Sequence, residues 1–183
     1  MGLAALLSSG ALFLIFVYPS ESRSALFADA CRFAGWSKLS LGLVAGMGIV
    51  GISLGYEYVL GRFGVMPQQA LNTYIVDALT TPTLGGALLL AVVCLAGPFM
   101  EELVFRGAMM NFFANTKKLP TVQVALVTSA IFTMMHFSPA LIPVVFVVGL
   151  VLATLRLKTG SLQPCIAAHT TSNTMFVLLA YPR

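Results

Sequence analysis

Charged side chains are scarce in this chain of 183 residues, where Asp, Glu, Lys and Arg together make up 9%. Soluble domains carry roughly a quarter of such residues, so the composition excludes an ordinary water-soluble protein. Hydrophobic residues reach 58%, and the mean hydropathy is +0.95. The net charge of +4 is small and scattered, which gives no indication of a nucleic-acid partner. We therefore predict an integral membrane protein that binds no nucleic acid.

Several other patterns are missing as well. The three cysteines, Cys31, Cys94 and Cys165, have no CxxC or metal-ligand spacing, so we expect buried thiols and no disulfide framework. The HExxH spacing of many zinc peptidases does not occur. No basic stretch precedes the apolar run at residues 2–18, so we interpret this run as a membrane span and not as a signal peptide.

Apolar runs long enough to cross a bilayer follow one another along the chain. A helical span needs about 20 mostly apolar residues, and six segments come close to this length. They are residues 2–18, 39–60, 83–113, 121–137, 140–156 and 161–181. We predict an all-α fold, a polytopic membrane helix bundle of about six transmembrane helices. Residues 1–82 would hold the N-terminal transmembrane helices and an interfacial loop, and residues 83–183 a catalytic core made of the last four helices. For residues 63–82 we expect an interfacial loop, a short amphipathic helix or a lid.

Small residues and one proline give further detail within these spans. The pairs Gly42/Gly46 and Gly51/Gly55 have the small-xxx-small spacing that lets membrane helices pack closely. Pro98 lies inside the third span, where it predicts a bend one turn before the two glutamates that follow.

Basic residues are distributed unevenly among the connections. Seven of them lie in the 19–38 loop and in the turns at 114–120 and 156–160, and two lie elsewhere outside the spans. The positive-inside rule places these three connections in the cytoplasm. The depth in the membrane of Glu101 and His136, counted from Lys118, differs by several ångströms from that of His169, counted from Lys158. The sequence therefore does not decide to which face of the membrane a site made of these residues would open.

Five polar residues stand inside segments that should otherwise lie in lipid. Ionisable groups at membrane depth are costly and rare, and their usual explanation is a functional site. Both histidines of the chain belong to this set. The five residues are Glu101, Glu102, His136, His169 and Asn173.

Spacing predicts that the first glutamate and the first histidine meet. The third and fourth spans form a hairpin that turns near Lys118, with Glu101 17 residues before this lysine and His136 18 residues after it. Two antiparallel helices of equal rise bring such positions to nearly the same height.

Two i, i+4 pairs complete the set. Glu102 and Arg106 have the spacing of an intrahelical ion pair, which would turn Glu102 into a supporting residue and leave Glu101 facing the bundle. A buried pair that only stabilises the fold explains Glu102 and Arg106 equally well. His169 and Asn173 project from one face of the last span, where interhelical hydrogen bonding is the alternative explanation.

These residue types permit hydrolysis of an amide. A glutamate beside a histidine can hold and deprotonate a water molecule, as Glu101 and His136 could. A second imidazole and a carboxamide can stabilise the oxyanion that forms when water adds to a carbonyl, as His169 and Asn173 could. Two His and one Glu (His136, His169 and Glu101) could instead bind a catalytic zinc ion, and the sequence does not separate the two possibilities. We predict no required cofactor, with a divalent metal such as zinc as the alternative.

Three short motifs resemble those of a known family. Residues Glu101–Arg106 read EELVFR and match EExxxR, Phe132–His136 match FxxxH, and His169–Asn173 match HxxxN/D. Together, in this order, they resemble the CAAX prenyl protease and bacteriocin-processing (CPBP, or Abi) intramembrane endopeptidases over residues 83–181. The resemblance implies that Glu101 and His136 activate water, that His169 and Asn173 form the oxyanion hole, and that Glu102 and Arg106 support the first motif.

The leading hypothesis is thus an intramembrane endopeptidase that hydrolyses a peptide bond near the membrane surface. Its partners would be the lipid bilayer and a membrane-associated peptide or protein substrate, and its location would be a prokaryotic cell membrane, since the chain is short. The alternatives are a non-catalytic membrane scaffold or bacteriocin-immunity protein, a zinc-dependent version of the same protease, and a cation or proton carrier that uses the same groups.

Overall fold

The protein is a bundle of helices. The computed structural model describes residues 20–65, 69–81, 83–136 and 139–180, with only the backbone given at 20–23 and 69–73. Within these residues every regular element is helical and no strand occurs, so the predicted all-α class is confirmed. The elements are α2 (Ser20–Cys31), α3 (Trp36–Arg62), α4 (Gln69–Thr80), α5 (Leu84–Ala91), η2 (Val92–Ala96), α6 (Gly97–Glu102), η3 (Leu103–Met109), η4 (Phe112–Thr116), α7 (Thr121–Met134), η5 (Pro139–Leu141), α8 (Ile142–Thr159) and α9 (Gln163–Leu179).

Three helices among the described residues are long and apolar enough to cross a membrane: Trp36–Arg62, Leu84–Thr116 and Pro139–Thr159. They correspond to the second, third and fifth predicted spans, whereas the first, residues 2–18, lies outside the described residues. Helix α7 is apolar but shorter, with 14 residues, and α9 has 17. The predicted count of six is therefore not confirmed.

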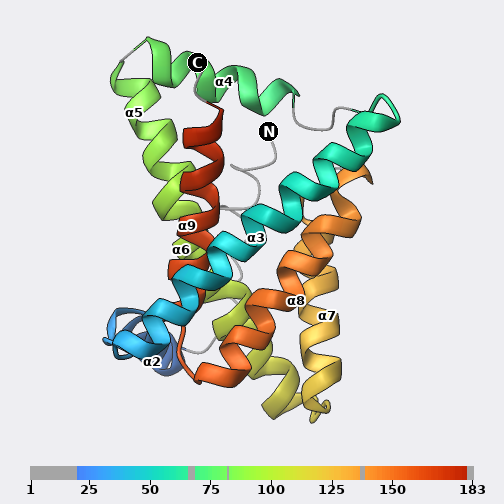
Figure 1. The fold of residues 1–183 in the computed structure, drawn as a ribbon. Helices are drawn as coiled ribbons and strands as arrows, with labels where there is room; N and C mark the ends of the chain where they lie inside the picture. The colour runs from blue at the N-terminus through green and yellow to red at the C-terminus, as the bar shows by residue number, and fades with distance from the viewer. Residues whose placement is uncertain (1–19, 66–68, 82, 137–138, 181–183) are drawn as a thin grey trace.

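Figure 1 shows how the helices are arranged. Helix α3 runs diagonally across the front, with α5, α6 and α9 on one side of the bundle and α7 and α8 on the other. Helix α4 lies across the upper end. The sequence predicted a loop, a short amphipathic helix or a lid for residues 63–82, and the structure has a short helix there. The turn after η4, the end of α8 and helix α2 all lie at the lower end, so the three basic connections share one end of the bundle.

One connection is more structured than expected. Residues 19–38 were interpreted as a loop, but helix α2 occupies Ser20–Cys31. Leu26 and Ala30, spaced i, i+4, lie on its inner face and are buried against Leu103 and Ala108 of the third span. The loop assignment was wrong because this short helix is stabilised by tertiary contacts and lacks the long apolar run of a span.

The glycine pairs of α3 behave differently from each other. A Cβ atom at Gly42 would lie 2.4 Å from the carbonyl oxygen of Pro164, and one at Gly46 would lie 2.5 Å from that of Ala168. This pair therefore lets the backbones of α3 and α9 approach directly, as predicted. Among the residues that the structure describes, no atom lies within 4 Å of a Cβ at Gly51 or Gly55, so the second pair makes no close helix contact with them, contrary to the prediction.

The third span is a continuous helix of 33 residues, Leu84–Thr116, that contains three π-helical segments. The first of these, η2, ends at Ala96, two residues before Pro98. There the Gly97 N–H donates to the carbonyl of Val92, five residues earlier. A π-helical turn thus accommodates the proline that the sequence predicted to bend this helix.

Polarity in this bundle is inverted relative to a soluble protein. Large apolar side chains such as Trp36, Leu84 and Met134 are at least 74% exposed, whereas Glu102 and Arg106 are inaccessible. Charged groups are almost never fully buried in soluble proteins unless they are paired. This distribution suits a molecule with a lipid-facing exterior and a polar centre.

Candidate active site

Glu101 and Glu102 lie side by side on α6, a short stretch of α-helix between the π-helical segments η2 and η3. Both side chains are buried. Such π-helical turns are rare and often occur at functional sites. Consecutive residues of a helix point about 100° apart, so the two carboxylates can take different partners.

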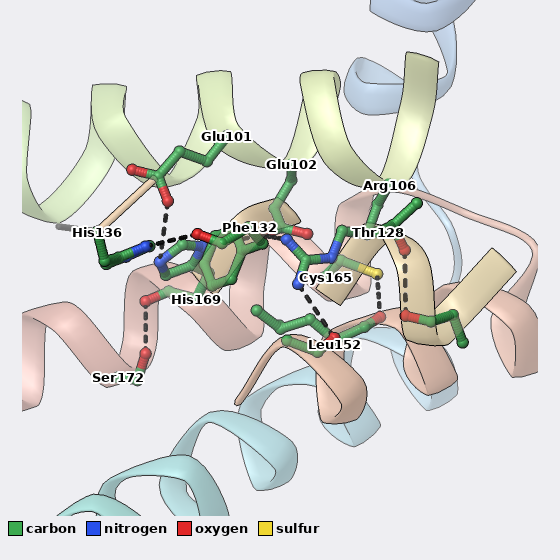
Figure 2. Close-up of polar contacts among 12 residues, drawn as sticks. Glu101, Glu102, Arg106, Thr128, Phe132, His136, Leu152, Cys165, His169 and Ser172 are labelled. Atoms are coloured by element: carbon green, nitrogen blue, oxygen red, sulfur yellow. Dashed lines mark hydrogen bonds and ion pairs between the residues drawn. The ribbon is translucent and has the colours of Figure 1, made fainter. Parts of the chain in front are cut away.

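Glu102 forms the centre of a buried charge network (Figure 2). Its Oε1 accepts hydrogen bonds from Arg106 Nη1 at 3.2 Å and from His169 Nδ1 at 2.8 Å. Arg106 Nη2 also donates to the carbonyl oxygen of Gly149 on α8, at 3.1 Å. The predicted Glu102–Arg106 ion pair is therefore present, and it joins the third span to α8 and α9. Charge-assisted hydrogen bonds of this kind offset part of the cost of burying the charges.

Glu101 faces the other nitrogen of the same imidazole. Its Oε2 lies 3.8 Å from His169 Nε2, and Figure 2 shows the carboxylate directed toward that ring. A separation of 3.8 Å is too long for a direct hydrogen bond. Oε2 is buried and has no hydrogen-bond partner among the described residues. A buried carboxylate oxygen in this position is available to a third group.

The ring of Phe132 on α7 packs against both imidazoles. Its centroid lies 4.6 Å from that of His136 and 6.0 Å from that of His169. The guanidinium carbon of Arg106 lies 4.5 Å from the same ring, within the range of a cation–π interaction. Phe132 is 1% exposed, so its ring is fixed by packing and in turn fixes the groups around it.

His136 follows the end of α7 and is half-buried. Its Nδ1 donates to the carbonyl oxygen of Phe132 at 2.8 Å, because a carbonyl can only accept. The neutral ring therefore keeps the lone pair of Nε2 for another partner. Among the described residues no hydrogen bond or ion pair joins His136 to Glu101 or His169, so the link between them runs through Phe132.

Asn173 lies one turn beyond His169 on α9. Its Nδ2 donates to the carbonyl oxygen of Val93 in η2, at 3.0 Å. This hydrogen bond uses one of the two amide N–H groups and leaves the other for a second acceptor. His169 and Asn173 thus contact the third span at two separate points, on either side of Pro98.

The structure brings four of the six predicted residues within ion-pair distance of one another. His136 contacts them only by way of the ring of Phe132, and Asn173 lies one helical turn from His169 without contacting the other predicted residues. The four are Glu101, Glu102, Arg106 and His169.

A zinc site was the alternative use of Glu101, His136 and His169. In the part of the chain that the structure describes, no three His, Cys, Asp or Glu side chains gather closely enough to hold a metal ion. The Nδ1 atom of each imidazole is bonded to a protein oxygen, which is usual for metal-bound histidines too, so only the distances between the three residues count against a metal centre. The residues do not fit a three-ligand metal centre in this arrangement, and we derive no reaction step through a metal.

Three contributors to the site were not anticipated. Phe132 is part of the FxxxH motif, but the sequence assigned it no role in the site. Its position four residues before His136, on the same helix face, could have indicated the contact between the two rings. The carbonyls of Gly149 and Val93 were missed as well. Pro98 signals that a carbonyl about one turn earlier lacks a backbone donor, but in an α-helix this would be the carbonyl of Cys94. Only the π-helical register of η2 makes it Val93.

The fold and the site define a class: a helical membrane protein with a buried Glu–Glu–Arg–His network. A family model described as "Type II CAAX prenyl endopeptidase Rce1-like" matches residues 83–175, about half of the chain. The chain therefore belongs to this family of CAAX-type intramembrane proteases. All three motifs lie within the matched residues.

A curated relative is an uncharacterized 24.3 kDa protein of Escherichia coli, which is 26% identical over 139 residues. The match covers 74% of this chain and 62% of the length of that protein. No solved structure matches this chain.

Proposed function

We propose that the protein is an intramembrane endopeptidase that hydrolyses a peptide bond of a membrane-associated substrate with water activated by Glu101. The observation that carries this proposal is the carboxylate of Glu101, which is buried, unpaired at Oε2 and 3.8 Å from His169 Nε2. Glu102 Oε2 also lacks a hydrogen-bond partner among the described residues, but Glu102 is held through Oε1 by Arg106 and His169, whereas Glu101 accepts no hydrogen bond from them. Burying a charged group without a partner costs several kcal/mol, so Glu101 is the carboxylate with most to gain from a bound water molecule. A water molecule beside Oε2 would supply the missing hydrogen bond.

The nucleophile is this water molecule. It donates one hydrogen to Glu101 and the other to the free Nε2 of His136, which directs its oxygen lone pair at the scissile carbonyl carbon. Glu101 takes a proton as the new C–O bond forms and the carbonyl π electrons move to oxygen. When the C–N bond breaks, the proton passes from Glu101 to the leaving amine. The products are a carboxylic acid and an amine, and the carboxylate of Glu101 is restored.

His169 and Asn173 stabilise the oxyanion in this scheme. The cationic form of His169 donates Nδ1–H to Glu102 and keeps Nε2–H for the developing negative charge. Asn173 contributes the amide N–H that Val93 does not use. Removal of one such donor typically costs about 10²–10³-fold in kcat.

Glu102 and Arg106 support the reaction without touching the substrate. They hold the imidazole of His169 through Nδ1, and Phe132 packs against its face. The substrate proposed here is a peptide or protein held at the bilayer. The family supports a peptidase of a membrane, and the bacterial origin of the relative supports the proposed prokaryotic cell.

The test is the chemistry of the product. The purified protein is reconstituted in liposomes with lipid-anchored peptides in H₂¹⁸O, and the fragments are analysed by mass spectrometry. Hydrolysis predicts one ¹⁸O atom in the new carboxyl group and one free amine for each cleavage. If the wild-type protein cleaves none of the peptides and substitutions at Glu101 and His169 change only stability or partner binding, the scaffold or immunity alternative is supported. Proton or cation flux across the same liposomes, lost in Glu101→Gln, would support the carrier alternative.

The zinc-dependent version is tested with the same preparation. Glutamate-activated water predicts that cleavage survives EDTA and that added Zn²⁺ does not raise the rate of the chelated protein. Loss of cleavage in EDTA with recovery on Zn²⁺ would assign the water activation to a metal held by Glu101, His136 and His169.

A further inference from the structure

Pro98 leaves a gap in the hydrogen bonding of the third span. In the π-helical turn η2, each N–H donates five residues back, as Gly97 does to the carbonyl of Val92. In the same register, the N–H of residue 98 would donate to the carbonyl of Val93. Proline has no N–H, so the backbone offers Val93 no donor in this register.

The side chain of Asn173 fills this gap. Its Nδ2 lies 3.0 Å from the carbonyl oxygen of Val93, although the two residues are 80 positions apart in the chain. In a membrane, an unsatisfied backbone carbonyl costs several kcal/mol, and helices with internal prolines depend on neighbouring side chains to satisfy it. Asn173 is half-buried, so water replaces this contact poorly.

We propose that Asn173 is a positioning residue whose amide takes the place of the N–H missing at Pro98 and thereby sets the orientation of Glu101. This role deepens the proposed function, on which its effect on turnover rests, and it is separate from the use of the second amide N–H on an oxyanion.

The geometry explains how the effect reaches the carboxylate. His169 and Asn173 lie four residues apart on one face of α9, and they bond to Glu102 and to Val93, on opposite sides of Pro98. Two attachment points restrict both the height and the rotation of the stretch of helix between Val93 and Glu102, whereas one point would restrict its rotation less. Glu101 lies three residues after Pro98 in that stretch, so its direction depends on both attachments.

A spectroscopic test needs no substrate. Val93–Cys94 is the only Val–Cys step in the sequence, so labelling with [¹³C′]valine and [¹⁵N]cysteine gives a single amide–carbonyl peak that reports on Val93. The peak should move in Asn173→Ala, because the carbonyl loses its donor, and stay in place in the control Asn115→Ala on exposed surface. An unchanged peak in Asn173→Ala would overturn the proposal, whatever the outcome of cleavage assays.

A kinetic test uses Pro98→Ala. Alanine gives Val93 a backbone donor in either register, from residue 98 in a π-helix or from residue 97 in an α-helix. Asn173→Ala should therefore reduce kcat about 10-fold more in the wild-type background than in the Pro98→Ala background, as expected for one hydrogen bond. KM should change equally in the two backgrounds.

An equal loss of kcat in both backgrounds would mean that Asn173 acts only by direct contact with the reacting group, which contradicts the positioning role. If Pro98→Ala does not fold, the spectroscopic comparison of the wild-type protein with Asn173→Ala still decides the question.

Discussion

Removal of the Arg106 guanidinium tests the buried network most severely. Arg106→Met keeps most of the side-chain volume but leaves Glu102, which is inaccessible, without the guanidinium group that pairs with it. Loss of one partner of a buried pair typically costs about 3–5 kcal/mol. His169 still donates to Glu102 at 2.8 Å, so we expect the lower half of that range. The buried carbonyl of Gly149 loses its donor at the same time, which adds to the loss of stability, so the destabilisation should not fall below this range.

The assay is reversible unfolding in mixed detergent micelles titrated with SDS. Arg156→Met is a matched control, because Arg156 pairs with Asp29 at 2.8 Å in a more exposed place, with 15% and 28% of the side chains accessible. Solvent-exposed pairs contribute about 0–1 kcal/mol, and because this pair is half-buried the control should lose about 1 kcal/mol, clearly less than Arg106→Met. In the double variant Glu102→Gln/Arg106→Met we expect about 1–3 kcal/mol less destabilisation than the sum of the single changes. Equal losses for Arg106→Met and Arg156→Met, or strict additivity in the double variant, would refute the network.

Further predictions concern packing. Gly46→Ala should destabilise the protein by about 1–3 kcal/mol, because its Cβ would meet the backbone of α9, whereas Gly51→Ala should leave stability unchanged or raise it by up to about 1 kcal/mol. SDS unfolding of the two variants measures the difference, and equal effects would contradict the close α3–α9 contact. Phe132→Leu removes the ring between the imidazoles and should reduce kcat/KM by about 10-fold or more, as expected when aromatic and cation–π contacts are lost together. An unchanged rate would mean that the ring does not position the histidines.

The sequence predicted the helical class and the pairing of Glu102 with Arg106 because both depend on local periodicity. An i, i+4 spacing fixes which side chains meet on one helix, whatever surrounds it. Gly42 and Gly46 likewise predicted a close helix contact, although the sequence did not say that α9 is the partner. Gly51 and Gly55 have the same spacing but no close neighbour in the described part of the chain. The pattern thus indicates where a second helix can pack closely, but not whether one does.

Other features depend on the packing of distant segments and could not be predicted. The contact between His169 and Glu102 joins residues 67 positions apart, and the helical form of α2 depends on its burial under the third span. The shortness of α7 also escaped prediction, since apolar residues continue beyond Met134 while the helix ends there. The roles of Glu101, His136, His169 and Asn173 and the division at residue 82 stay predictions.

The central claim is that Glu101 is the base that activates water, and the most direct measurement compares Glu101→Gln with Glu57→Gln in the same cleavage assay. Both changes replace one carboxylate by an amide of equal size, but Glu57 lies on α3, outside the site. General-base catalysis predicts that kcat falls about 10²–10⁴-fold for Glu101→Gln, with the fold intact, and stays near the wild-type value for Glu57→Gln. Full activity of Glu101→Gln on a substrate that the wild-type protein hydrolyses would contradict the mechanism.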